Sequence, residues 1–92
     1  MTRKQIIEFV EQYPEEAVEN VVLLDGLDEA FVGLIAQEDA YVAVYSVGRI
    51  LDILIKRDSI DYSDAMEFYD FNIGALNVGP QSPLFMDTMD TP

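Results

Sequence analysis

The chain has 92 residues, the length of one small domain, and half of them are hydrophobic, which is enough to build a core without disulfide or metal staples. Cysteine and histidine are both absent, which excludes disulfides, thiolate chemistry and the commonest metal ligand. Eighteen acidic against five basic residues give a net charge of −13, which disfavours direct contact with nucleic acid or anionic membranes and favours a partner with a basic surface.

The first predicted element is an amphipathic helix over residues 2–13. Its apolar side chains recur at the i, i+3, i+4, i+7 spacing of a helix, at Ile6, Phe9, Val10 and Tyr13. Thr2 suits the N-cap, with Gln5 at the reciprocal capping-box position. Pro14 ends this helix or begins a further short one, since the two glutamates after it suit a helix start.

Three short stretches predict a small antiparallel sheet. Residues 20–24 are a continuous apolar run before the turn signal Asp25-Gly26, which is typical of a buried strand. Residues 29–36 and 40–45 are rich in β-branched and aromatic side chains and are separated by a short polar stretch, so they predict a hairpin. Gly33 within the hairpin indicates a β-bulge or a close approach of backbone.

Two helices are predicted after the hairpin. Ser46 suits the N-cap of a helix over residues 47–57, and Asp61 suits the N-cap of a second helix that ends at Asn72 or Gly74. The face of the second helix that we expect to be buried is broad and consists of Tyr62, Ala65, Met66, Tyr69 and Ile73, extended by Phe68 and Phe71.

The remaining residues have the composition of loops. Residues 78–83 contain two prolines and predict a structural crossover or a binding loop, and residues 84–86 predict a short edge strand. We therefore expect one α+β domain over residues 1–86, with a small antiparallel sheet of three to four strands packed against two to three helices. Residues 87–92 are expected to be a flexible C-terminal tail.

The sequence offers little for catalysis or for binding metal ions. Without histidine or cysteine, an active site would need paired carboxylates or a serine with lysine, and no spacing specifies either. The stretch Asp25-Gly-Leu-Asp-Glu29 has its glycine at the second position of a calcium loop instead of the sixth, and Ala36 occupies the place of the bidentate glutamate. We expect no enzyme activity, no cofactor and no metal site.

The most suggestive feature is the arrangement of acidic residues along the outer faces of the predicted helices. Rows of carboxylates on a rigid scaffold can imitate a phosphate backbone and occupy the basic groove of a nucleic-acid-binding protein. The alternative is a solvated surface that only keeps the protein soluble. The candidate partner-binding residues are Asp52, Asp61, Asp64, Glu67, Asp70, Tyr62 and Phe68.

The aromatic residues of this region are too numerous to be buried together in so small a domain. Some of them should form an exposed patch, and such patches usually mark an interface. The interface could serve a protein partner or a homo-oligomer, although self-association must overcome the repulsion of so much negative charge. No apolar run reaches the roughly 18 residues of a membrane span, and no secretory signal begins the chain, so we expect a cytoplasmic protein.

Seven short stretches within about residues 20–86 carry a resemblance to known proteins. They are Asp25-Gly-Leu-Asp-Glu-Ala-Phe-Val-Gly33, Val42-Ala-Val-Tyr45, Ile50-Leu-Asp-Ile-Leu54, Arg57-Asp58, Phe71-Asn-Ile-Gly74, Val78-Gly79 and Ser82-Pro-Leu-Phe85. In these stretches the chain resembles a family of small acidic proteins encoded by tailed bacteriophages and their prophages. Relatives usually carry an aromatic residue near Leu76 or Asn77, where this chain differs. The family is uncharacterised, so the resemblance implies a setting in the cytoplasm of an infected bacterium and supplies no catalytic residues.

Taken together, the sequence predicts a non-enzymatic acidic binding or accessory protein that engages a basic host or phage protein, as a nucleic-acid mimic or inhibitor. The alternative is a self-associating structural or assembly protein whose acidic surface only gives solubility. The two hypotheses differ in what the exposed surface contacts. In the first hypothesis it contacts a basic partner, and in the second it contacts another copy of the chain.

Overall fold

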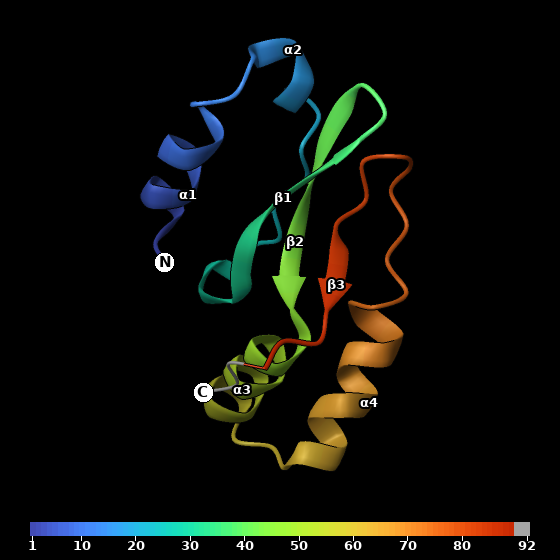
Figure 1. Cartoon of the computed structure of the whole chain (residues 1–92). Helices are drawn as coiled ribbons and strands as arrows, with labels where there is room; N and C mark the ends of the chain where they lie inside the picture. Colours follow the sequence, from blue (N-terminus) through green and yellow to red (C-terminus); the bar gives the residue numbers. More distant parts are fainter. Residues whose placement is uncertain (90–92) are drawn as a thin grey trace.

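The middle of the chain forms the predicted hairpin. In this computed structural model, which describes residues 1–89, strands β1 (Phe31–Gln37) and β2 (Ala40–Ser46) pair antiparallel. The register shifts immediately before Gly33, which confirms the predicted β-bulge. Strand β3 (Leu84–Met86) pairs with the other edge of β2, so that the sheet has the order β1-β2-β3 (Figure 1).

The α+β class is confirmed, but the sheet differs from the prediction in two respects. It is mixed, because β3 runs parallel to β2 after a long connection through two helices and a loop. The strand predicted at residues 20–24 is wrong, because residues 21–24 pair with no strand. Their side chains still pack against the core, since an apolar run reports burial and not the type of secondary structure.

The helical elements are α1 (Arg3–Val10), α2 (Glu15–Val18), the 3-10 turn η1 (Asp28–Ala30), α3 (Val47–Asp58) and α4 (Tyr62–Asn72). The capping signals correctly predicted where α1, α3 and α4 begin. The turn η1 was not predicted, and it contains residues 29 and 30, which were expected to begin the first strand of the hairpin. Oxygens of Thr2, Ser46 and Asp61 each accept a hydrogen bond from the backbone N–H three residues later, at 3.2, 3.2 and 2.8 Å. Each bond satisfies an N–H that the first turn of the helix leaves without a partner.

The core lies between one face of the sheet and the helices α1, α3 and α4. Its fully buried side chains include Ile6 of α1, Tyr45 of β2, Ile50 and Leu54 of α3, and Ala65 of α4. A chain of aromatic contacts with centroids 4.8–6.5 Å apart runs through it, in the order Tyr41, Tyr13, Phe9, Phe31, Tyr45, Phe85 and Tyr69. These rings join α1 to the sheet and the sheet to α4 on a single face.

The segment after α4 is held by its own hydrogen bonds. The Ser82 hydroxyl accepts from the backbone N–H of Val78 at 2.8 Å and donates to the carbonyl of Gly79 at 2.7 Å. Beyond β3, the hydroxyl oxygens of Thr88 and Ser46 lie 2.8 Å apart, so residue 88 is fixed beside the start of α3. Part of the tail predicted over residues 87–92, namely residues 90–92, lies outside the described part of the chain.

Candidate functional site

Helix α4 carries apolar side chains on two opposite faces. Ala65 is fully buried, and Met66 and Tyr69 are partly buried against the core. Phe68 and Phe71 follow the other face of the helix and are 41% and 76% exposed. The expectation that these two phenylalanines extend the buried face is therefore wrong.

The exposed phenylalanines lie among carboxylates. Asp64, Glu67, Phe68, Phe71 and Asn72 line one shallow hollow of about 280 Å³, and we call this surface the α4 outer face. Both carboxylates are exposed, and within residues 1–89 neither forms an ion pair with a lysine or arginine. The α4 outer face thus combines unneutralised negative charge with solvent-exposed aromatic rings.

Two of the predicted partner-binding residues have structural roles. Asp61 is the N-cap of α4, and its carboxylate accepts the backbone N–H of Asp64 at 2.8 Å. Asp52 lies on α3, where it forms an ion pair with Lys56 one helical turn away, at 3.0 Å. Both acids therefore contribute to the helices that carry them.

Two more predicted residues lie on α4 but outside its outer face. Tyr62 is 62% exposed in the first turn, so the expectation that it belongs to the buried face is wrong. Asp70 is exposed on an adjoining side of the helix. The structure brings the other three predicted residues together, namely Asp64, Glu67 and Phe68.

Phe71 belongs to the same surface and was not among the predicted site residues. The signal that could have found it is a second i, i+3, i+4, i+7 series on α4, formed by Asp64, Glu67, Phe68 and Phe71. This series competes with the buried one, which is why the sequence did not reveal the direction of the phenylalanines.

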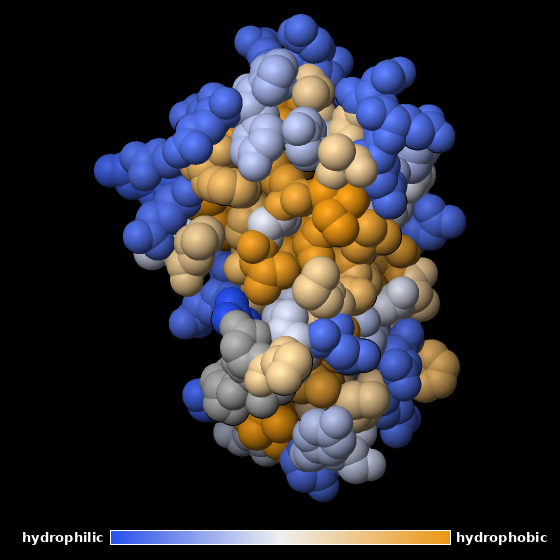
Figure 2. All heavy atoms as spheres, in the orientation of Figure 1, coloured by the Kyte–Doolittle hydropathy of each residue, from blue (hydrophilic) through white to orange (hydrophobic). Residues whose placement is uncertain are grey.

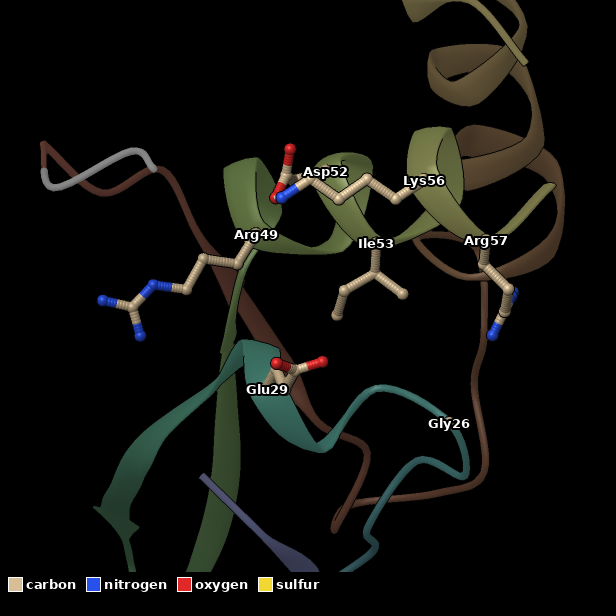
Figure 3. A pocket seen from close by; sticks show the side chains of 7 residues that line it. All are labelled: Gly26, Glu29, Arg49, Asp52, Ile53, Lys56 and Arg57. Atoms are coloured by element: carbon tan, nitrogen blue, oxygen red, sulfur yellow. The ribbon is translucent and has the colours of Figure 1, made fainter. Parts of the chain in front are cut away.

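Basic residues gather elsewhere, beside α3. A hollow of about 670 Å³ between α3 and the turn before β1 is lined by Gly26, Glu29, Arg49, Asp52, Ile53, Lys56 and Arg57 (Figure 3). Figure 3 shows Ile53 and Glu29 pointing into this hollow, while Lys56 lies against Asp52 on its outer rim. Arg57 is paired with Asp58 at 3.4 Å. With Asp58 included, three cations are matched by three carboxylates at this hollow, so it lacks the excess positive charge that an anion site needs.

Among residues 1–89, the groups with shifted pKa values are two tyrosines of the core. Burial raises the pKa of Tyr45 above the ordinary value of 10.0, and it raises the pKa of Tyr69 in the same way. Both rings belong to the aromatic chain of the core, so their shifts reflect packing. Among residues 1–89, no group of three or more acidic side chains is arranged to hold a metal ion, and none of the described helices has the length and apolarity to cross a bilayer.

Comparisons with models of protein families, with curated proteins and with solved structures gave no match. By exposure, charge and composition, the α4 outer face is the candidate site.

Proposed function

We propose that this chain is a small non-enzymatic binding protein that engages a basic surface of another protein through the α4 outer face. The observation that carries the proposal is Phe71, which is 76% exposed beside the carboxylates of Asp64 and Glu67. Aromatic residues at the centre of an interface supply much of its binding energy, and the surrounding charges select the partner. Phe68, 41% exposed on the same face, enlarges the apolar contact.

The charge of the whole chain supports the same class of partner. A net charge of −13 creates a negative field that attracts a basic surface before contact and increases the rate of association. Such attraction is screened by salt, over about 10 Å at an ionic strength of about 0.1 M. The binding that we propose therefore weakens as salt is added.

The resemblance of residues 20–86 to phage proteins suggests the setting, in which the partner is a host or phage protein in the bacterial cytoplasm. Asp64 and Glu67 of the α4 outer face are followed at the same three-residue interval by Asp70 on the adjoining side of the helix, and neighbours in this row lie about 4.5 Å apart along the helix axis. A partner that normally binds a phosphate backbone suits such a row. In this form of the proposal the chain acts as a nucleic-acid mimic that inhibits its partner.

The test is quantitative affinity capture from bacterial lysate, with the purified chain as bait at low and moderate salt. We expect one or a few basic proteins to be retained, in amounts that fall as salt rises. Phe71→Ala should abolish retention because it removes the apolar anchor, and the double variant Asp64→Asn/Glu67→Gln should weaken it because it removes the charges that face the partner.

Matched control variants test whether retention depends on the α4 outer face itself or on exposed aromatic rings and negative charge anywhere on the chain. Tyr62→Ala removes another exposed aromatic ring from the same helix, and Glu8→Gln/Glu11→Gln removes two exposed carboxylates from the α1 region. Both control variants should retain the partner as the unmodified chain does. Equal loss in test and control variants, or binding that is insensitive to salt, would contradict the proposal.

A competition experiment tests the mimic form. Duplex DNA is added to the captured complex at constant ionic strength. If the chain occupies a nucleic-acid-binding groove, DNA should displace it, and a partner that is not displaced would leave the binding proposal standing without the mimicry.

A further inference from the structure

The sheet has a second face that points away from the core. Because residues paired across strands share a face, the register places Ile35 beside Val42, Val44 beside Leu84, and Met86 beside Ser46. Val42 and Val44 of the central strand are buried, at 1% and 3% exposure, yet neither belongs to the core cluster that the helices complete. We call the surface formed by Ile35, Val42, Val44, Leu84 and Met86 the open sheet face.

The open sheet face is apolar and accessible. Ile35, Leu84 and Met86 are 38%, 37% and 43% exposed, whereas the two valines of the central strand are nearly buried beneath their neighbours. Figures 1 and 2 look onto this side, where no helix crosses the strands and hydrophobic atoms gather over the middle of the molecule. A contiguous apolar surface of this kind usually marks a docking surface.

The charge distribution indicates which occupant fits. The strand residues directed to this face are Gly33, Ile35, Gln37, Ala40, Val42, Val44, Ser46, Leu84 and Met86. None of them is charged, although the chain contains 18 acidic residues. The nearest carboxylates in sequence lie at the ends of the strands, in the hairpin turn at Glu38 and Asp39 and at Asp87 after β3.

A basic partner would find no complementary charge on this surface. A second copy offers the same uncharged apolar residues, and stacking two such faces buries no carboxylate from the strands. We propose that the open sheet face is an isologous interface at which two copies of this chain pack sheet against sheet. Sheets that stack in this way lie about 10 Å apart, which leaves the acidic helices on the outside of the pair.

Salt should affect this dimer and the binding proposed for α4 in opposite directions. Each copy carries a net charge of −13, so long-range repulsion opposes dimerisation. Raising the ionic strength from about 0.1 M to about 1 M shortens the screening length from about 10 Å to about 3 Å. Dimerisation should therefore strengthen with salt, whereas capture of a basic partner weakens, so each proposal can fail without the other.

Sedimentation velocity over a dilution series of the purified chain tests the dimer at low and high salt. The unmodified chain should shift from monomer to dimer as its concentration rises. In high salt, this shift should occur at a lower protein concentration than in low salt. Ile35→Lys should remain monomeric under both conditions because it places two ammonium groups in the interface. Ile7→Lys is the matched control: Ile7 is 44% exposed on α1, the change in net charge is the same, and the dimer should persist.

A second variant covers the case in which Ile35→Lys fails to fold, which circular dichroism would show. Met86→Lys makes the same change on the opposite edge strand, where the side chain is 43% exposed. It should also be monomeric. A chain that is monomeric at every concentration and salt, or a dimer that survives both substitutions on the open sheet face, would overturn the proposal.

Discussion

The backbone N–H of Leu24 donates a hydrogen bond to the hydroxyl oxygen of Tyr45 across 2.8 Å. Tyr45 is completely buried in β2, and its ring contacts both Phe31 and Phe85. The bond therefore attaches the irregular segment before η1 to the central strand of the sheet. A single side chain supplies the partner that a neighbouring strand would otherwise have supplied to this N–H.

Tyr45→Phe should lower the free energy of unfolding by about 1–2 kcal/mol, because the partly buried N–H of Leu24 loses its acceptor while the packing of the ring is kept. Urea denaturation followed by circular dichroism measures the change. Tyr41→Phe is the control, since Tyr41 packs on Tyr13 and its hydroxyl makes no hydrogen bond within residues 1–89. Equal stability losses in the two variants would count against the role of this bond.

The same contact explains why the strand predicted at residues 20–24 is absent. The apolar run correctly signals burial, and Val21, Leu23 and Leu24 do pack against the core. Whether such a run pairs as a strand depends on what lies beside it in space. Here the hydroxyl of Tyr45, which accepts the hydrogen bond from the N–H of Leu24, belongs to a residue 21 positions later in the chain. No local sequence pattern predicts that contact.

Local signals predicted the rest of the fold well. The hairpin and the helices that begin after Thr2, Ser46 and Asp61 follow from spacing and capping chemistry, which act within a few residues. The parallel pairing of β3 and the outward direction of Phe71 are decided by tertiary packing. The sequence therefore predicted the acidic residues of α4 as candidates, but it could not show which of them share a surface with an exposed ring.

Stability should depend on alkaline pH through Tyr45. Burial raises the pKa of Tyr45 above 10.0, and this effect exceeds the opposing effects of the Leu24 hydrogen bond and of Arg3. Unfolded tyrosine ionises near pH 10 while the buried ring keeps its proton, so the folded state binds more protons above that pH. The contribution of Tyr45 to stability is therefore complete below pH 10 and is lost as the pH rises above it.

Urea denaturation between about pH 8 and about pH 11 checks this dependence. The free energy of unfolding should fall more steeply above pH 10 in the unmodified chain than in Tyr45→Phe. Tyr69, whose pKa is also raised by burial, contributes to both proteins alike. Identical slopes in the two proteins would show that Tyr45 ionises as easily in the folded state as in the unfolded one.

The N-cap of α4 gives a prediction that separates structure from binding. Asp61→Ala should lower the free energy of unfolding by about 1 kcal/mol, because the backbone N–H of Asp64 loses its acceptor. Asp70→Ala, at an exposed acid with no capping role, should change stability by less than about 0.5 kcal/mol. Thermal or urea unfolding measures both. We expect capture of a basic partner to survive Asp61→Ala under conditions where the variant is folded, and its loss would place Asp61 in the binding surface.

The exposed ring of Phe71 gives the sharpest contrast with the core. Truncating a buried leucine removes packing and leaves a cavity, so Leu54→Ala, at a fully buried position of α3, should lower the free energy of unfolding by about 2–5 kcal/mol. Phe71→Ala removes a larger side chain, yet it should change stability by less than about 0.5 kcal/mol because the ring is 76% exposed. Urea denaturation of the two variants in parallel measures the difference. A large loss for Phe71→Ala would mean that the ring supports the fold, whereas a small one leaves binding as the reason for an aromatic residue at this position.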